Sequence, residues 1–217
     1  MTRRESLPVR AITVEEVVAG ADRLGRMVRS SGFVPDTVIA VARGEFMPAR
    51  FVCDFLGISR LMSVKVQHYA AGAHAGTEAR VTVPLGGPIE GKHVLVVDDV
   101  NDSGKTLQAL GPYLDDLRPA SVRTAVLHEK QVTACPADFV AEHIQEWRWV
   151  LYPWAVVEDV GQFLRDMQPV PATREEAVSR LNAEHGLQLD DAELDRVLFY
   201  EGIRLDRDKD RRAARTQ

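Results

Sequence analysis

The stretch HVLVVDDVNDSGKT, at residues 93–106, places three acids and a glycine turn directly after an apolar run. Asp98 and Asp99 end the run, and Asp102 opens the turn. From 102 to 106 the chain offers backbone N–H groups and two hydroxyls at an expected helix start, which favours a phosphate monoester. The adjacent carboxylates suit the vicinal hydroxyls of a sugar, or Mg²⁺ held through water, either of which would relieve their repulsion. The stretch therefore predicts a site for one sugar phosphate.

Two other interpretations of the acidic turn are weaker. The phosphate loop of nucleotide triphosphatases needs a glycine five residues before the glycine of GKT, and Asp99 occupies that position. In the second interpretation, one aspartate only caps the helix while the others are solvated. The apolar run before the acids and the Ser-Gly-Lys-Thr sequence after them favour the ligand site.

The composition is ordinary for a soluble globular protein. With 217 residues the chain is long enough for one domain with a small appendage and a sizeable core. Its net charge of -5 indicates no basic face for nucleic acid. Cys53 and Cys135 lack metal-binding spacing, which argues against a disulfide framework or a zinc site and suits a reducing cytoplasm. No apolar run reaches the length of a signal peptide or a membrane span, so we expect neither export nor anchoring.

Strands and helices are expected to alternate along most of the chain. A capping box at Thr13 and Glu16 begins a first helix, which ends near Gly32. Apolar runs predict strands at 37–42, 61–67, 93–98, 121–128 and 148–152, with helices at 46–57 and 105–117. This alternation predicts an α/β fold, a Rossmann-like and mostly parallel sheet with helices on both faces. In such sheets ligands bind beyond the carboxyl ends of the strands, where Asp98 is expected.

Two segments depart from this alternation. Residues 69–88 are rich in Gly and Ala, with one short strand pattern at 79–83, and predict a long mobile loop or hairpin. After residue 168 the chain becomes linker-like and then helical. These segments give an expected domain at 1–168 and an expected helical appendage with a flexible tail at 169–217.

The appendage is expected to contain two short helices. Thr173 begins one through a capping box, Gly186 ends it, and another follows Asp190. The pair could suggest a helix-turn-helix, but no cluster of basic residues precedes the tail. A cover for the core or a dimer contact is therefore the favoured role.

Residues 94–107 resemble, without a gap, the phosphoribosyl-diphosphate signature of the type I phosphoribosyltransferases. The resemblance implies that Asp98 and Asp99 bind the ribose hydroxyls together with Mg²⁺. It implies a 5′-phosphate cradle made by Asp102, Ser103, Gly104, Lys105 and Thr106. Asp102 also resembles the family's catalytic general base, which lies beside the purine N7; the alternative is a helix cap.

The segment 41–57 resembles the family's pyrophosphate loop and the helix after it. Arg43 would contact the pyrophosphate, assisted by the backbone around Gly44. An ordinary strand-to-helix turn is the alternative. Glu45 stands where the bacterial xanthine/guanine enzymes usually have a small residue, and it puts a negative charge near an anion site. Residues 69–88 would then be the family's mobile hood.

The remaining motifs resemble the 6-oxopurine members of the family, over a total resemblance of roughly 35–160. In those enzymes a lysine donates to the purine O6, an aromatic residue stacks on the base, and the next residue's backbone reads the N1/C2 edge. By position these are Lys130, Trp149 and Val150, and YPW at 152–154 echoes the same group. A solvated lysine and a core-packed tryptophan are the alternatives.

The resemblance implies a purine-salvage enzyme that transfers a phosphoribosyl group from phosphoribosyl diphosphate to hypoxanthine, guanine or xanthine. Mg²⁺ is the expected cofactor, small molecules the expected partners, and a homodimer the expected assembly, with no nucleic acid or membrane. Glu158 and Asp159 could bind a second metal ion or, equally, act as helix-start acids. One alternative is a regulator of the same fold that senses phosphoribosyl diphosphate. Another is a transferase for adenine, orotate or uracil, against which Lys130 and Trp149 argue.

Overall fold

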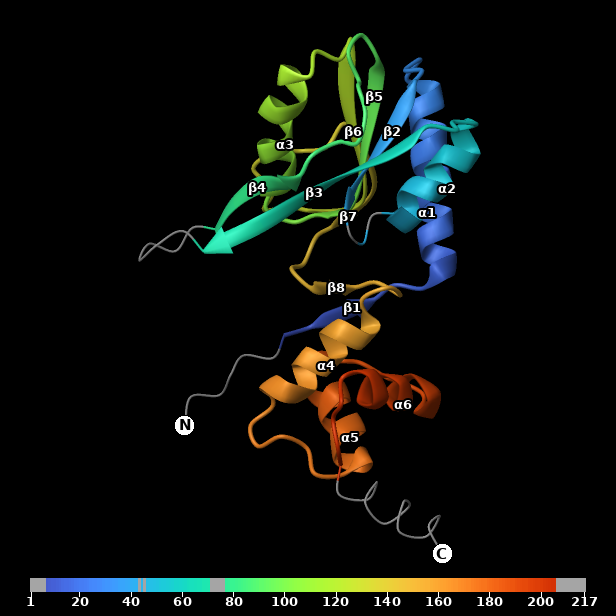
Figure 1. Cartoon of the computed structure of the whole chain (residues 1–217). Coiled ribbons are helices and arrows are strands. Elements are labelled where there is room, and N and C mark those ends of the chain that lie inside the picture. The colour runs from blue at the N-terminus through green and yellow to red at the C-terminus, as the bar shows by residue number, and fades with distance from the viewer. Residues whose placement is uncertain (1–6, 43, 45, 71–76, 206–217) are drawn as a thin grey trace, which may run out of the picture. The chain divides into compact units, whose positions relative to one another are not determined.

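The computed structural model describes residues 7–42, 44, 46–70 and 77–205 of the chain (Figure 1). The chain forms two compact units. The larger unit runs from Val14 to Trp147, and the smaller joins the segment up to Thr13 to the segment from Arg148 onward. This division differs from the one expected after residue 168.

The larger unit is built on one six-stranded sheet with the order β4-β3-β2-β5-β6-β7. Its strands are β2 (Thr37–Ala42), β3 (Leu61–Ala70), β4 (Thr77–Val83), β5 (His93–Asn101), β6 (Ser121–Lys130) and β7 (Phe139–Ile144). All neighbouring strands are parallel except β3 and β4, which are antiparallel. The predicted α/β fold with a mostly parallel sheet is therefore confirmed.

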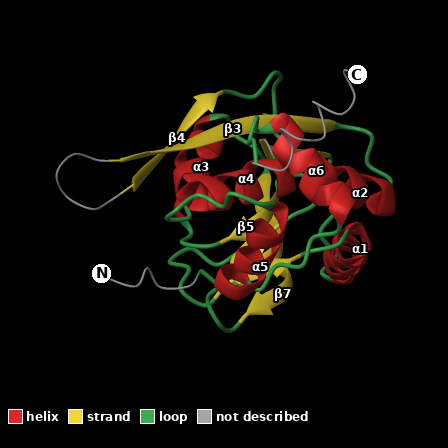
Figure 2. Ribbon diagram, turned by 90° about the horizontal axis from the view of Figure 1, so that it is seen from below, coloured by secondary structure: helices red, strands yellow, loops and turns green. Residues whose placement is uncertain are grey.

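Helices cover both faces of this sheet. They are α1 (Val14–Ser30), α2 (Phe46–Leu56) and α3 (Lys105–Asp116). Figure 2 shows α3 on one side of β5 and β7, with α1 and α2 on the other. Helix α3 turns Leu107, Leu110 and Leu114 toward the sheet, one turn apart, and all three are buried. The core of this face also includes Ile39 of β2 and Val96 of β5.

The order of the strands fixes where a ligand can bind. From β2 the chain passes through α2 to β3 on one side, whereas from β5 it passes through α3 to β6 on the other. Adjacent strands β2 and β5 therefore form the switch point of the sheet, and the loops at their carboxyl ends diverge to opposite faces. Such a switch point is the general ligand site of open α/β sheets.

Strands β5 and β6 extend further than the sequence predicted. Pairing continues to Val100 with His128 and to Asn101 with Glu129. The predicted end of the strand at Asp98 is therefore wrong, because the polar residues after it still find backbone partners across the ladder.

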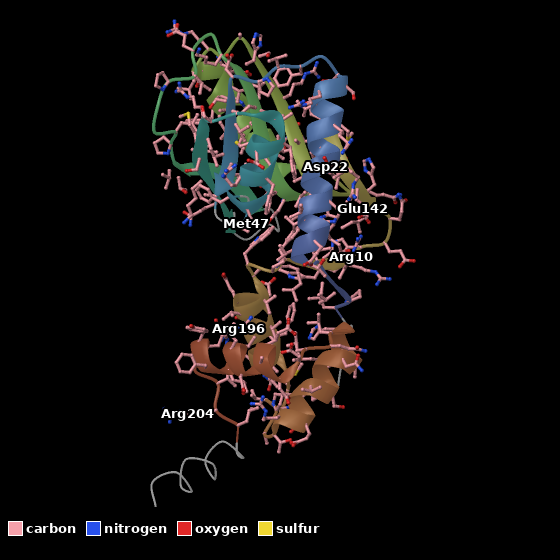
Figure 3. The ribbon with its side chains drawn as sticks, turned by 90° about the vertical axis from the view of Figure 1, so that its right-hand side faces the viewer. Arg10, Asp22, Met47, Glu142, Arg196 and Arg204 are labelled. Carbon is pink, nitrogen blue, oxygen red and sulfur yellow. The ribbon has the colours of Figure 1, made fainter. Side chains whose placement is uncertain are left out.

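Two further features of the sheet differ from expectation. Strand β7 was not predicted; Glu142, labelled in Figure 3, and neighbouring His143 interrupt its apolar pattern.

The predicted hood begins as the antiparallel pair β3–β4. Beyond β4, the Leu85 amide donates to the Tyr113 hydroxyl of α3 at 2.8 Å, which ties this segment to the core. The hood's tip, 71–76, lies outside the described residues, and its mobility stays a prediction.

The described residues of the smaller unit form its own two-stranded sheet and three helices. These are β1 (Val9–Ala11), β8 (Trp149–Leu151), α4 (Val156–Asp166), α5 (Arg174–His185) and α6 (Asp191–Tyr200). Strand β8 pairs in parallel with β1 and not with the main sheet, as the sequence alone would have placed it. Leu151, Leu164, Leu181 and Leu194 share one core. That shared core explains why β8 and α4 belong with the appendage helices.

Both predicted appendage helices are confirmed. The Thr173 hydroxyl accepts a hydrogen bond from the Glu176 amide, and Asp190 forms a capping box with Glu193. Helix α6, on which Figure 3 labels Arg196, carries this one basic residue beside three acids. The helix thus offers no basic recognition surface. No helix among the described residues has the length and apolar character needed to cross a membrane.

Candidate functional site

The paired acids lie at the carboxyl end of β5, beside the switch point. Asp98 is 4% exposed and Asp99 is 8% exposed. The Asp99 amide donates to Oδ1 of Asp98 at 2.8 Å, which fixes the orientation of that carboxylate. Buried carboxylates are stable when hydrogen-bond donors or a cation share their charge, and hydroxyls or Mg²⁺ would add to those present.

The phosphate loop, residues 102–105, joins β5 to α3. Gly104 is the N-cap of α3 and adopts a left-handed conformation with φ of 83°, without a side-chain cap. Lys105 and Thr106 form the first turn, so their amides belong to the positive end of the helix. The loop thus has the form that binds anions through backbone N–H groups.

A second segment packs directly against the phosphate loop. A Cβ atom at Gly104 would lie 2.5 Å from the backbone nitrogen of Cys135, so no side chain fits there. The Ala134 amide also donates to the Ser103 carbonyl at 3.2 Å. The shape of the phosphate loop therefore depends on the segment that follows β6.

The structure brings the predicted base and the predicted purine donor together. Asn101 and Glu129 are ladder partners, so the next residues, Asp102 and Lys130, face one another. The Lys130 ammonium donates to Oδ2 of Asp102 at 2.7 Å. The Lys130 side chain is 4% exposed, whereas that of Asp102 is 43% exposed. A buried cation therefore lies beside an accessible carboxylate.

Trp147 also belongs to this cluster, and sequence reasoning missed it. The Lys130 ammonium lies 4.5 Å from the centroid of its ring. A cation over an indole face is attracted by the ring's quadrupole, more strongly when it is desolvated. The available signal was a second tryptophan two residues before Trp149, but the resemblance to the 6-oxopurine enzymes selected Trp149 by position.

The other predicted purine residues lie in the smaller unit, on β8. The Trp149 indole N–H donates to Oδ2 of Asp159 at 2.8 Å, and the ring meets Phe163 edge-on. Val150 is buried and is the ladder partner of Arg10. Trp149 is still 38% exposed, so part of the ring is accessible.

The two acids suggested for a second metal ion stand in the first turn of α4. Burial raises the pKa of Asp159, the hydrogen bond from Trp149 lowers it, and the nearby charge of Glu158 raises it further. The net pKa is above the ordinary aspartate value. Because Asp159 already accepts the Trp149 indole N–H, the structure gives it a role in holding that ring.

Of the predicted pyrophosphate residues, Gly44 lies between β2 and α2, at the switch point. Arg43 and Glu45 lie outside the described residues. Among the residues that are described, no group of three or more His, Cys, Asp or Glu could hold a metal ion. The Asp98–Asp99 pair nevertheless fits Mg²⁺, which often takes one or two protein carboxylates and completes its shell with substrate oxygens and water.

A family model described as a phosphoribosyl transferase domain matches residues 13–158. The chain belongs to this family. The match covers the larger unit together with β8 and the start of α4, and therefore includes Asp98, Asp102, Lys130, Trp149 and Val150 but ends before Asp159.

Named relatives and a solved structure agree with the family. The chain is 33% identical over 100 residues to a hypoxanthine-guanine phosphoribosyltransferase of Crithidia fasciculata, covering 44% of this chain and 48% of the relative. It is 29% identical over 136 residues to a xanthine-guanine phosphoribosyltransferase of Ruegeria sp., covering 58% and 74%. The crystal structure of a purine phosphoribosyltransferase from Pyrococcus horikoshii superimposes with a TM-score of 0.60 at 28% identity, covering 68% and 94%. The aligned part thus spans about half of the Crithidia protein's own length.

Replacing Gly104 with alanine should destabilise the protein more than the addition of one methyl group suggests. A left-handed conformation costs a non-glycine residue about 1–2 kcal/mol, and the added Cβ would also meet backbone. We expect a clear fall in the urea unfolding midpoint and loss of phosphate binding. Gly111→Ala in the same helix is the control, since nothing lies within 4 Å of its Cβ position. Equal midpoints for the two variants would contradict the close packing.

Replacing Asp159 with asparagine should change how stability depends on pH. Because the folded pKa is raised above the ordinary 3.8, the folded state binds more protons than the unfolded state between the two values. The contribution of Asp159 to the free energy of unfolding therefore falls as pH rises through that window. Asp159→Asn keeps an acceptor for Trp149 and should gain stability relative to the wild type over the same window. Urea unfolding at several pH values, followed by tryptophan fluorescence, measures this; a difference independent of pH would contradict it.

Proposed function

We propose that this phosphoribosyltransferase transfers the 5-phosphoribosyl group of phosphoribosyl diphosphate to a 6-oxopurine and releases pyrophosphate. The acceptor is hypoxanthine, guanine or xanthine. The observation that carries the proposal is the pair of Asp102 and Lys130, 2.7 Å apart and directly beside a phosphate loop. The names of the Crithidia and Ruegeria relatives support the same class of acceptor.

The sugar phosphate would occupy the end of β5 and the start of α3. The amides of the phosphate loop and the first turn of α3 would bind the 5′-phosphate. Asp98 and Asp99 would accept hydrogen bonds from the ribose hydroxyls and hold Mg²⁺. That ion, when bound, would supply positive charge next to the departing pyrophosphate. Gly44, and by resemblance Arg43, would bind the pyrophosphate from the β2 loop.

Lys130 would select the purine. Its ammonium has only hydrogen-bond donors, so it pairs with the oxo group at C6 and opposes the amino group of adenine. Its burial strengthens that discrimination, because a donor facing a donor without water leaves both unsatisfied. Trp149 would stack on the base and the backbone of Val150 would read the N1/C2 edge, as the resemblance implies.

The chemical step would be a displacement at the anomeric carbon. The bond from C1 to the purine N9 forms, the bond to the pyrophosphate oxygen breaks, and configuration inverts. Positive charge develops on the sugar, so the carboxylates of Asp98 and Asp99 stabilise the transition state electrostatically. Asp102, which is accessible, would take the purine proton at N7 as N9 attacks.

We further propose a cytoplasmic homodimer that acts on small molecules alone. The net charge of -5 supports the absence of a nucleic-acid partner. The first turn of α4 would serve to orient Trp149, with a metal ion at Glu158 and Asp159 as the alternative.

The substrate panel is the direct test. The protein is mixed with Mg²⁺, phosphoribosyl diphosphate and one base at a time, and nucleotide formation is followed. At least one of hypoxanthine, guanine and xanthine should react, with adenine, orotate and uracil slower by about a hundredfold or more, because a mismatched buried donor is strongly rejected. Equal reaction of adenine would overturn the role of Lys130. Binding without transfer to any base would favour the sensing regulator instead.

Replacing Asp102 with asparagine tests the general base, because the helix-cap alternative is already wrong: Gly104 is the N-cap of α3 and no side chain caps that helix. Asparagine keeps an oxygen that can accept from Lys130 but cannot take a proton, so turnover should fall by about a hundredfold or more. The unfolding midpoint should also fall, because the buried Lys130 ammonium loses its charged partner, so turnover is compared at a temperature at which both proteins are folded. Asp116→Asn, at the exposed far end of α3, is the matched control and should keep full turnover. Near-normal turnover in Asp102→Asn, or a loss confined to stability, would contradict the assignment.

A further inference from the structure

Two buried polar residues, Asn101 and Glu129, connect the last residues of β5 and β6. Asn101 is 3% exposed and Glu129 is 5% exposed. The amide nitrogen Nδ2 of Asn101 donates to Oε2 of Glu129 and to the carbonyl of Cys135, each at 2.8 Å. Neither residue is among those that the resemblance assigns to the site.

Glu129 is held from three directions. Its Oε2 accepts a second hydrogen bond, from the Ala137 amide at 2.8 Å. Its Oε1 lies 3.8 Å from Nδ1 of His143 on β7, an exposed side chain. A buried carboxylate is stable only while such donors surround it, so these contacts also fix the positions of the donors.

These bonds reach the phosphate loop through the segment 133–137, which we call the crossover segment. Cys135 and Ala137 are tied to Asn101 and Glu129, respectively. The same segment contacts Gly104 through Cys135 and accommodates no Cβ atom there. Gly104 caps α3 without a side chain, so no side chain of the cap restrains the phosphate loop. The contacts with the crossover segment restrain it instead.

We propose that Asn101 and Glu129 are positioning residues that set the geometry of the phosphate loop through the crossover segment. The proposal rests on the proposed function, since the phosphate it concerns is that of phosphoribosyl diphosphate. Both residues are buried, and the proposal assigns neither a contact with the substrate. Asn101 directly precedes Asp102, and Glu129 directly precedes Lys130. The hydrogen bond between Asn101 and Glu129, which we call the bridge, therefore fixes the phosphate loop and the purine donor relative to one another. Preorganised donors bind an anion without the cost of ordering the loop.

The decisive variants replace the hydrogen-bond donor of the bridge, at position 101, with an acceptor, first alone and then together with a new donor at position 129. Asn101→Asp sets a carboxylate against that of Glu129 and against the Cys135 carbonyl. Its KM for phosphoribosyl diphosphate should rise by about tenfold or more, with faster amide hydrogen exchange at 133–137, since a buried repulsive pair displaces its neighbours. In Asn101→Asp combined with Glu129→Gln, the new glutamine amide donates back to the carboxylate introduced at position 101. That double variant should lower the KM only part of the way back, because the Ala137 amide then faces a donor and the Cys135 carbonyl still faces a carboxylate.

A matched control distinguishes positioning from stability. Asp36 accepts a hydrogen bond from the His93 amide at 2.7 Å, at the opposite end of the same strand β5. Asp36→Ala should lower the unfolding midpoint while leaving the KM for phosphoribosyl diphosphate within about twofold, because only the far end of the ladder loses a bond. If Asn101→Asp raised the KM no more than Asp36→Ala, or if the double variant recovered nothing, the bridge would be merely structural.

Calorimetric titration with phosphoribosyl diphosphate and Mg²⁺ separates failure of this proposal from failure of the proposed function. The titration needs no acceptor base. A wild type that bound phosphoribosyl diphosphate but transferred it to no base would overturn the proposed function while the bridge was still tested by affinity. Unchanged affinity and unchanged exchange at 133–137 in Asn101→Asp would overturn the bridge alone.

Discussion

The pairing of β5 with β6 up to their last residues is the constraint on which the site depends. Because the ladder continues to Asn101 and Glu129, the next residue of each strand is placed opposite the other. A buried ammonium is tolerated only with a partner, and Asp102 supplies it at 2.7 Å. If β5 ended at Asp98, Asp102 would project from a longer loop while Lys130 stayed on β6, which also pairs with β7 at Ile144, and Asp102 would have to be ordered at each binding event.

The second constraint is the close approach of two backbones at Gly104. A left-handed glycine allows the crossover segment to lie against the phosphate loop, where any Cβ atom would meet the Cys135 nitrogen at 2.5 Å. This close contact restrains the phosphate loop on the side that faces the crossover segment. The amides in the first turn of α3 are therefore already oriented before a phosphate binds, which reduces the entropy lost on binding.

The sequence predicted the elements whose signal is local. The capping boxes at Thr13 and Thr173 and the apolar runs of β2 and α3 depend on neighbours a few residues apart. Elements with diluted patterns were missed, as with β7, where Glu142 and His143 stand in a six-residue strand. Contacts between residues that are far apart in the sequence leave no pattern in the sequence from which they could be predicted. Asn101 and Glu129 are 28 residues apart, and the stacking of Lys130 on Trp147 needs the fold to bring them together.

The environment of Lys130 explains how one residue could serve both selection and catalysis in the proposed reaction. An ammonium has three N–H donors; one is directed to Asp102, and the indole of Trp147 lies against the same group. The purine O6 can therefore accept a hydrogen bond from Lys130 while the ion pair with Asp102 stays intact. When Asp102 takes the purine proton, its negative charge disappears and less of the lysine charge is neutralised. That charge is then directed more strongly at O6, so proton transfer to Asp102 would strengthen the hydrogen bond that holds the purine in place.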